Sequence, residues 1–258
     1  MSRRVLLEVR DGVATVTLNH PDRMNAIDEE MREQLPPVVE RLTDPAIRAV
    51  VITGSGRAFS AGGSVDWFER EWNTREFRLH SHRLSAVYDE IESLEKPVIA
   101  AINGAATGAG LQLALACDLR IASSVAKLGY REHHLALIPG HGGATRLVKL
   151  IGLSRAKQLY FAGDLVDAEF AERIGLVHRI VSPEELIEEA HREAATLAAR
   201  APGALGLAKK LLNAAADVDT RTGLALESLA QSVAVKTSDH REGVRAFREK
   251  RAPDFRGE

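Results

Sequence analysis

The chain has 258 residues and a formal net charge of −2, and 45% of its residues are apolar and 27% charged. This length is sufficient to bury a sizeable core, and the composition is that of an ordinary soluble globular protein. The near-neutral balance offers no basic footprint for nucleic acid, and no apolar run approaches the roughly 18 residues of a membrane span. We therefore expect neither nucleic acid nor a membrane as a partner.

The first residues and the cysteine content bear on the compartment. Residues 1–4 lack the apolar segment of a signal peptide, and a strand pattern begins at Val5. The single cysteine, Cys117, excludes an intramolecular disulfide and weakly favours a reducing compartment. It lies in an apolar run without basic neighbours, so we expect a small buried side chain and not a nucleophile. These features predict a cytoplasmic protein.

In chain order, the expected strands cover residues 5–10, 13–18, 47–53, 97–102, 118–122 and 177–181. The expected helices cover residues 28–42, 74–94, 143–150 and 154–162, and the chain from residue 183 onward is almost wholly helical. Asp11 and Gly12 predict a hairpin between the first two strands. Pro36 and Pro37 lack backbone donors and predict a kink or break in the first helix. The alternation of helix and strand predicts a largely parallel α/β core in residues 1–182, followed by a helical C-terminal domain in residues 183–258.

Two of the expected strands run directly into glycine-rich segments. Residues 54–64 follow the strand 47–53, and residues 103–110 follow the strand 97–102 and open an apolar helix. Amide groups at a helix N-terminus lack internal partners and can hold negative charge, and glycine lets a ligand approach them closely. Downstream, Glu132 lies between further glycine turns. This combination suits a reaction in which backbone amides hold a carbonyl oxygen that gains charge while Glu132 moves a proton.

Ordered motifs along nearly the whole chain extend this pattern. They are TLNHP at residues 17–21, MNA at 24–26, the two glycine-rich segments, GD at 163–164 and REGVRAFREKR at 241–251. Together they resemble the crotonase superfamily, the enoyl-CoA hydratase/isomerase family. The resemblance implies an α/β fold, a crotonase-like spiral of ββα repeats whose helical C-terminal domain drives assembly into a homotrimer or a dimer of trimers. It also implies an acyl-CoA thioester as the substrate, with coenzyme A as part of that substrate and no separate cofactor.

The resemblance assigns roles to individual residues. It places the two oxyanion-hole amides on Gly63 and Ala109 and a catalytic carboxylate on Glu132. Gln112 stands where hydratases usually carry a second glutamate, and Gly140 where isomerases often carry an acid. Gln112 can orient a water or a carbonyl but cannot exchange a proton near neutral pH. The implied substrate and CoA contacts are Met24, Ala26, Ala61, Gly62, Ser64, Gly108, Gly110, Pro139, Gly140, Phe247 and Lys250.

The nucleotide part of CoA is expected to contact the C-terminal region. In the family, a phenylalanine and a lysine of a neighbouring subunit meet the adenine and a phosphate, and these positions are Phe247 and Lys250. Asp66 stands where the family usually has a further lysine, so the resemblance does not supply that phosphate contact. Residues 67–83 are expected to line the acyl pocket, and their sequence does not define the length of the acyl chain.

Several alternatives stay open at this point. With one acid, double-bond migration or retro-aldol cleavage by a lyase competes with hydration, and a non-catalytic acyl-CoA binder would keep the glycine-rich segments without needing Glu132. Ser60 and Ser64 lack the Gly-x-Ser-x-Gly pattern of a hydrolase, and Ser64 is expected to cap a helix. His133 and His134 would point to opposite faces of an extended segment, so no metal site is expected. We rank an enoyl-CoA hydratase/isomerase-type enzyme first.

Overall fold

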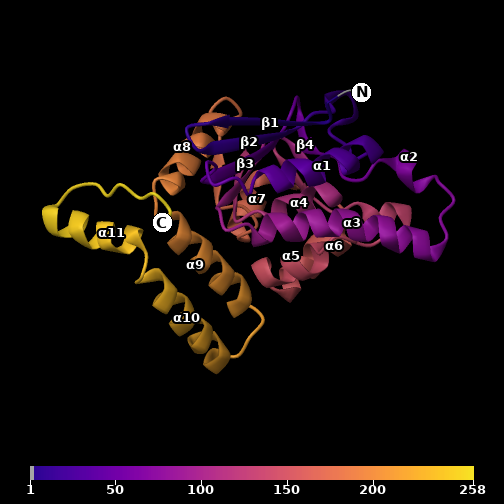
Figure 1. Ribbon diagram of the computed structural model, residues 1–258. Coiled ribbons are helices and arrows are strands. Elements are labelled where there is room, and N and C mark those ends of the chain that lie inside the picture. The colour runs from indigo at the N-terminus through magenta and orange to yellow at the C-terminus, as the bar shows by residue number, and fades with distance from the viewer. Residues whose placement is uncertain (1–2) are drawn as a thin grey trace.

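The computed structural model describes residues 3–258 as two sheets with helices packed around them (Figure 1). The strands are β1 (Val5–Arg10), β2 (Val13–Leu18), β3 (Ala49–Gly54), β4 (Ala58–Ser60), β5 (Val98–Ile102), β6 (Ala105–Thr107), β7 (Leu119–Ser123), β8 (Lys127–Gly129), β9 (Val166–Asp167) and β10 (Arg179–Val181). The α-helices are α1 (Glu29–Arg41), α2 (Val65–Phe68), α3 (Thr74–Ser93), α4 (Ala109–Ala116), α5 (Gly143–Ile151), α6 (Leu153–Ala162), α7 (Ala168–Arg173), α8 (Leu186–Ala198), α9 (Pro202–Ala215), α10 (Thr220–Ala234) and α11 (Ser238–Glu249). Short 3₁₀ helices are η1 (Pro21–Arg23) and η2 (Glu132–Leu135).

The larger sheet has the strand order β1-β2-β3-β5-β7-β10. β1 and β2 form the antiparallel hairpin expected around Asp11 and Gly12, with Val5 opposite Leu18. The other neighbouring strands of this sheet pair in parallel. β3 and β5 are buried along their whole lengths, as is usual for parallel strands covered on both faces. The predicted, largely parallel α/β architecture is confirmed.

The smaller sheet, with the order β4-β6-β8-β9, is not among the predicted elements. β4, β6 and β8 pair in parallel, and β9 joins β8 in the antiparallel sense. Each of these strands has three residues or fewer, which is too short to show an alternating hydrophobic pattern in the sequence. The two glycine-rich segments leave this sheet at the ends of β4 and β6, so the smaller sheet positions the candidate site.

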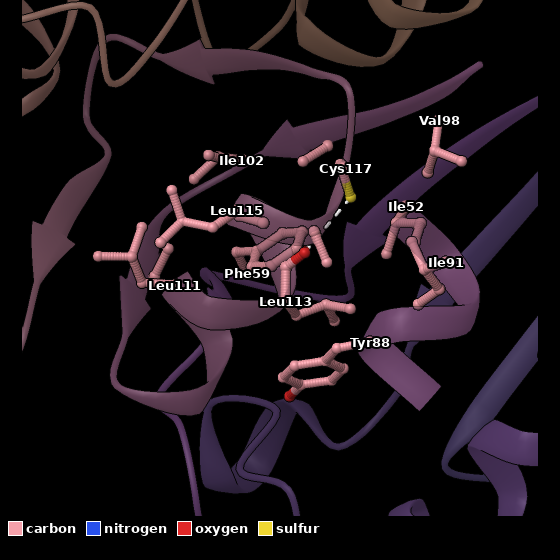
Figure 2. Packing of buried hydrophobic residues seen from close by; sticks show 14 of the residues in the cluster. Ile52, Phe59, Tyr88, Ile91, Val98, Ile102, Leu111, Leu113, Leu115 and Cys117 are labelled. Carbon is pink, nitrogen blue, oxygen red and sulfur yellow. Dashed lines mark hydrogen bonds between the residues drawn. The ribbon is translucent and has the colours of Figure 1, made fainter. Parts of the chain in front are cut away.

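The main core lies between one face of the larger sheet and the helices α1, α3 and α4. Figure 2 shows part of it, where Tyr88 and Ile91 of α3 and Leu113 of α4 lie with Ile52 and Val98 of the sheet. A second cluster fills the opposite face, because α8 packs its buried residues against β2, β3, β5 and β7. The larger sheet is therefore covered on both sides.

Cys117 lies within this main core, at the end of α4 (Figure 2). Its thiol is in contact with the carbonyl oxygen of Leu113 at 3.5 Å, and burial raises the pKa of the thiol to about 12. A thiol held neutral in this way is a poor nucleophile. The prediction of a small buried side chain is confirmed.

Helix α1 runs through Pro36 and Pro37 without the predicted break. Its buried residues are Met31, Leu35 and Val39, whereas both prolines are exposed. The hydrogen bonds that proline cannot make are therefore missing on the solvent side, where water can satisfy the freed carbonyl groups. Burial of the apolar face of α1 stabilises the helix despite these losses. The expectation of a break is wrong, and the alternative expectation of a kink stays a prediction.

The last three helices, α9 to α11, extend away from the layered body (Figure 1). α9 and α10 pack against each other, and α10 leaves Leu224 and Leu229 on the surface with exposed fractions of 59% and 65%. Phe247 of α11 is 86% exposed. α8 lies on the C-terminal side of the domain boundary expected at residue 183, but its buried residues pack on the larger sheet of the N-terminal part. The division into two domains stays a prediction. Among residues 3–258, no helix combines the length and apolar character needed to cross a bilayer.

Candidate active site

The two glycine-rich segments touch each other where they leave β4 and β6. Thr107 donates its hydroxyl hydrogen to the Ala61 carbonyl at 2.8 Å. Gly62 has φ +92°, and a Cβ there would lie 2.7 Å from the Thr107 oxygen and 3.2 Å from the Ala109 nitrogen. Glycine is required at Gly62 both for its backbone conformation and for this close approach. The contact brings the Gly63 and Ala109 regions together, although they lie 46 residues apart in the sequence.

The amide groups of Gly63 and Ala109 are free of partners among the described residues. Gly63 forms an isolated parallel bridge with Ile27, but the bridge uses the Gly62 carbonyl and the Ser64 amide. Ala109 is the first residue of α4, where an amide has no intrahelical partner. Both residues line one cavity of about 280 Å³. Two unpaired N–H groups at a cavity wall can bind an oxygen that becomes negatively charged.

Glu132 is the first residue of η2 and lines the same cavity. Its Oε1 accepts a hydrogen bond from Gln112 Nε2 at 2.9 Å, and its Oε2 accepts one from the Arg131 amide at 3.0 Å. Gly108 leaves room for the Glu132 carboxylate, because a Cβ at position 108 would crowd it at 3.3 Å from Oε1. Burial raises the pKa of the carboxyl, and the hydrogen bonds from the backbone and from Gln112 partly oppose that rise. A raised pKa suits a group that must both take and return a proton near neutral pH.

Gln112 is held at both ends of its amide group. Its Oε1 accepts a hydrogen bond from the His141 backbone amide at 2.7 Å, which can only donate, so the Nε2 end must face Glu132. The side chain is 2% exposed. It passes directly over Gly143, where a Cβ would lie 2.5 Å from Gln112 Cγ. The second hydrogen of Nε2 has no partner among the described residues and can hold a water oxygen beside the Glu132 carboxylate.

His141 is a further polar residue of the cavity wall. Its Nδ1 lies 3.0 Å from Ser85 Oγ, and its ring meets Tyr88 edge to face at a centroid distance of 5.9 Å. Burial lowers the pKa of His141 to about 4, and the positive charge of Arg32 adds to this effect. The ring is therefore neutral at physiological pH. Tyr88 in turn donates its hydroxyl hydrogen to the Ala109 carbonyl at 2.9 Å, which fixes the start of α4.

An aromatic cluster, formed by Trp67, Phe68, Trp72 and Phe77, contributes to the cavity wall. Trp67 contacts the other three rings at centroid distances of 4.8 to 5.4 Å. Phe68 lies against Gly63, where a Cβ would approach its ring to 2.9 Å. Trp67, Phe68 and Phe77 line the cavity, within the stretch 67–83 that was expected to form the acyl pocket.

The predicted site residues divide into two groups. The cavity wall contains Ala61, Gly62, Gly63, Gly108, Ala109, Gln112, Glu132 and Gly140. The others lie elsewhere: the Met24 carbonyl accepts a bond from the Ala61 amide, Gly110 packs on Ser60, and Pro139 lines a neighbouring apolar groove with Tyr160 and Phe161. Ala26 precedes the bridge residue Ile27, and Ser64 follows Gly63. Phe247 and Lys250 lie at the end of α11, a helix that extends from the layered body (Figure 1), and neither lines the cavity. Their roles in binding stay predictions.

Two expectations about local structure are corrected. Ser64 stands at the N-cap position of α2, but its side chain makes no capping hydrogen bond. His133 and His134 belong to η2 and not to an extended segment, and their rings lie together with centroids 4.2 Å apart. Among residues 3–258, no group of three or more His, Cys, Asp or Glu side chains is arranged to hold a metal ion.

Sequence reasoning did not single out Arg32, Tyr88 or Ser85. They lie on α1 and α3, where a charged or hydroxyl residue in a helical pattern is usually read as part of the solvated face or the core. The packing of α1 against α3 and of α3 against α4 brings Arg32 to the cavity wall, and it sets Tyr88 and Ser85 behind that wall against Ala109 and His141. No local motif could have identified them.

Comparison with known proteins decides the family. The family described as enoyl-CoA hydratase/isomerase matches residues 8–258. The chain belongs to this family. It is 40% identical to the short-chain-enoyl-CoA hydratase of Clostridium acetobutylicum, covering 96% of this chain and 95% of that protein. It is 37% identical to the crotonyl-CoA hydratase of Syntrophomonas wolfei, covering 97% of each.

The fold of this enoyl-CoA hydratase/isomerase family member matches solved structures equally well. The crystal structure of the enoyl-CoA hydratase from Bacillus anthracis superposes with a TM-score of 0.95 at 36% identity, covering 99% of this chain and 100% of that one. An enoyl-CoA hydratase subunit from Geobacillus kaustophilus gives a TM-score of 0.93 at 37% identity, with 99% and 98% covered. The crotonase-like fold expected from the motifs is confirmed.

Proposed function

We propose that this protein adds water to the double bond of an enoyl-CoA thioester, with Glu132 as the single acid/base. The observation that carries the proposal is the Gln112–Glu132 hydrogen bond of 2.9 Å in a cavity that also presents the unpaired amides of Gly63 and Ala109. The names of the relatives, which are hydratases, support hydration over cleavage or simple binding. Coenzyme A enters as part of the substrate.

The geometry provides one group for each need of this reaction. The thioester oxygen binds to the Gly63 and Ala109 amides, and a water molecule is held by the free hydrogen of Gln112 Nε2 beside Glu132. The water oxygen bonds to Cβ while its proton passes to Glu132, and the electron pair of the double bond moves onto the thioester oxygen as an enolate. Glu132 then returns a proton to Cα, the enolate collapses, and the carboxylate is regenerated. One carboxyl group is sufficient because it takes and gives a proton in the same cycle.

The direct test is a product assay with the purified protein. Crotonyl-CoA, a 3-enoyl-CoA and a 3-hydroxyacyl-CoA are supplied separately, and mass detection distinguishes hydrated, isomerised and cleaved products. We expect a mass gain of one water from crotonyl-CoA and its reversal from the 3-hydroxyacyl-CoA. Cleavage to a shorter acyl-CoA, or binding of all three thioesters without turnover, would contradict the proposal.

The active assembly is proposed to be a homotrimer or a dimer of trimers. The exposed apolar side chains of Leu224, Leu229 and Phe247 on α10 and α11 support a surface that is covered by neighbouring subunits. A closed ring requires heterologous interfaces of this kind. Light scattering at micromolar concentration should give a mass of at least three chains of 28.1 kDa each, and a monomer would contradict it. A cytoplasmic location stays a prediction.

A further inference from the structure

Arg32 is a guanidinium in the wall of the candidate active site that the proposed mechanism does not use. It belongs to α1, is only partly buried, and lines the cavity together with Trp67 and His141. Its Cζ lies 4.2 Å from the centroid of the Trp67 ring. This cation–π contact holds the guanidinium beside the Trp67 ring without using any of its N–H donors.

The Arg32 donors lack partners within the described part of the chain. Nε and Nη1 are buried and make no hydrogen bond to any of residues 3–258, and no carboxylate lies within 4.0 Å of the guanidinium. The nearby acids are engaged elsewhere, because Asp28 pairs with Arg4 and Glu29 pairs with Arg70. The indole Nε1 of Trp67 is also buried without a partner among these residues. Two unpaired donor groups in one cavity wall are unusual, since buried polar groups are normally hydrogen-bonded.

The electrostatic state of the cavity also favours an anion near Arg32. Burial lowers the pKa of Arg32, which nevertheless stays protonated at neutral pH. Burial raises the pKa of Tyr88 and lowers that of His141, and the charge of Arg32 opposes the first shift and adds to the second. The charge therefore acts beside the residues that hold Ala109 and Gln112. Among the described residues, no carboxylate, that of Glu132 included, forms an ion pair with Arg32 within 4.0 Å. A carboxylate is the planar partner that a guanidinium fork matches best.

We infer that Arg32 selects acyl-CoA substrates whose acyl group ends in a carboxylate. This inference rests on the proposed function, because it places the thioester at Gly63 and Ala109 and the far end of the acyl group against the guanidinium. The aromatic cluster packs against the carbon chain, and the Trp67 indole N–H is a further donor for a carboxylate oxygen. A plain hydrocarbon chain leaves the Arg32 donors unpaired in a desolvated wall, which is unfavourable.

The test compares two pairs of thioesters that differ only in the terminal group. Turnover is measured with glutaconyl-CoA, which ends in a carboxylate, and with crotonyl-CoA, which ends in a methyl group. Binding is measured by calorimetry with the saturated analogues glutaryl-CoA and butyryl-CoA, which need no catalysis. The parent is expected to prefer the carboxylate in both measurements.

Three variants separate the role of the charge from general damage. Arg32→Met keeps the apolar stem and should lower the ratio of glutaryl-CoA to butyryl-CoA affinity, and the corresponding kcat/KM ratio, by about 10- to 100-fold, the size of a lost charge-assisted hydrogen bond. Arg32→Lys keeps the charge without the planar fork and should retain part of the preference. Arg41→Met is the matched control, because Arg41 is exposed at the end of the same helix, and both ratios should equal those of the parent.

The outcomes distinguish this inference from the proposed function. Hydration of crotonyl-CoA together with equal affinity of the parent for glutaryl-CoA and butyryl-CoA would overturn the role of Arg32 and leave the function intact. Absence of turnover with both enoyl thioesters would overturn the function, while the calorimetric ratio would still decide whether Arg32 recognises a carboxylate. Equal losses for both ligands in Arg32→Met would show that Arg32 acts on the part that they share, and would also overturn the inference.

Discussion

Replacing Gln112 with glutamate tests the chemistry of the site most informatively. In the structure, Gln112 Nε2 lies 2.9 Å from Glu132 Oε1, so Gln112→Glu would set two carboxyl oxygens at that separation. Two unit charges 2.9 Å apart repel by roughly 6 kcal/mol at an effective dielectric constant of about 20, which would raise one pKa of the pair by roughly 4. The pair would therefore share one proton at neutral pH. The backbone amide of His141 would still donate to the other oxygen and hold the new side chain in place.

Sharing one proton gives the variant an acid and a base at the same time. We expect Gln112→Glu to raise the kcat for hydration of crotonyl-CoA by about 10-fold, below the about 10²–10⁴-fold typical of a full acid–base group, because Glu132 already provides one. The rate of the parent should rise with pH as Glu132 ionises and then stay level, whereas the rate of the variant should rise and then fall as the shared proton is lost. Loss of absorbance by the conjugated thioester measures both profiles.

The matched control for this experiment exchanges the two side chains. Gln112→Glu combined with Glu132→Gln keeps one carboxyl group and one amide but reverses their places. It should be slower than the parent if the proton must be delivered from position 132. A Gln112→Glu protein that folds, and yet shows the parent's level pH profile and no gain in rate, would refute the idea that both side chains face one water molecule.

Two further predictions concern the oxyanion amide and the buried histidine. Gly63→Pro should lower kcat by roughly 10²–10³-fold because it removes an N–H donor. Gly63→Ala is the control, since its side chain meets the same Phe68 ring but its backbone keeps the N–H. Equal losses of kcat in the two variants would exclude the Gly63 amide from the oxyanion hole. Because the pKa of His141 is lowered to about 4 in the folded state, its contribution to stability is complete above about pH 6.5 and is lost as the pH falls through 4. Urea unfolding measures the free energy of unfolding at pH 7 and at pH 4. For His141→Gln, the decrease in this free energy between the two pH values should be smaller than for the parent by roughly 3 kcal/mol. An equal decrease in both proteins would contradict the prediction.

The larger sheet and its helices could be predicted from the sequence, because most of these elements are long enough to show the hydrophobic pattern of a strand or a helix. Asp11 and Gly12 identify the hairpin, and the apolar runs of β3 and β5 identify buried parallel strands. The smaller sheet could not be predicted, because strands of two or three residues are too short to show a hydrophobic periodicity. The prolines of α1 misled the prediction, since their effect depends on which face of the helix is exposed.

The site could be predicted only where it is made of backbone and local motifs. The glycine-rich segments and Glu132 are legible in the sequence, and the structure brings them to one cavity. The partner that fixes Gln112 is a backbone amide 29 residues away, and no side-chain pattern encodes it. Arg32 is 100 residues from Glu132 in the sequence, and only the packing of α1 against α3 places it in the same cavity. The fixed position of Gln112 and the presence of Arg32 in the cavity wall therefore depend on long-range packing, which the sequence does not reveal.

The most direct test of the account is the kinetics of Glu132→Gln together with its affinity for a saturated acyl-CoA. The substitution keeps the size and the contact with Gln112 but removes the exchangeable proton, so kcat for the best enoyl-CoA should fall by about 10²–10⁴-fold. The Kd for butyryl-CoA or glutaryl-CoA, measured by calorimetry, should remain near that of the parent, because the thioester oxygen and the nucleotide bind elsewhere. A folded Glu132→Gln protein that binds these thioesters and turns over its substrate as fast as the parent would contradict the assignment of Glu132 as the acid/base.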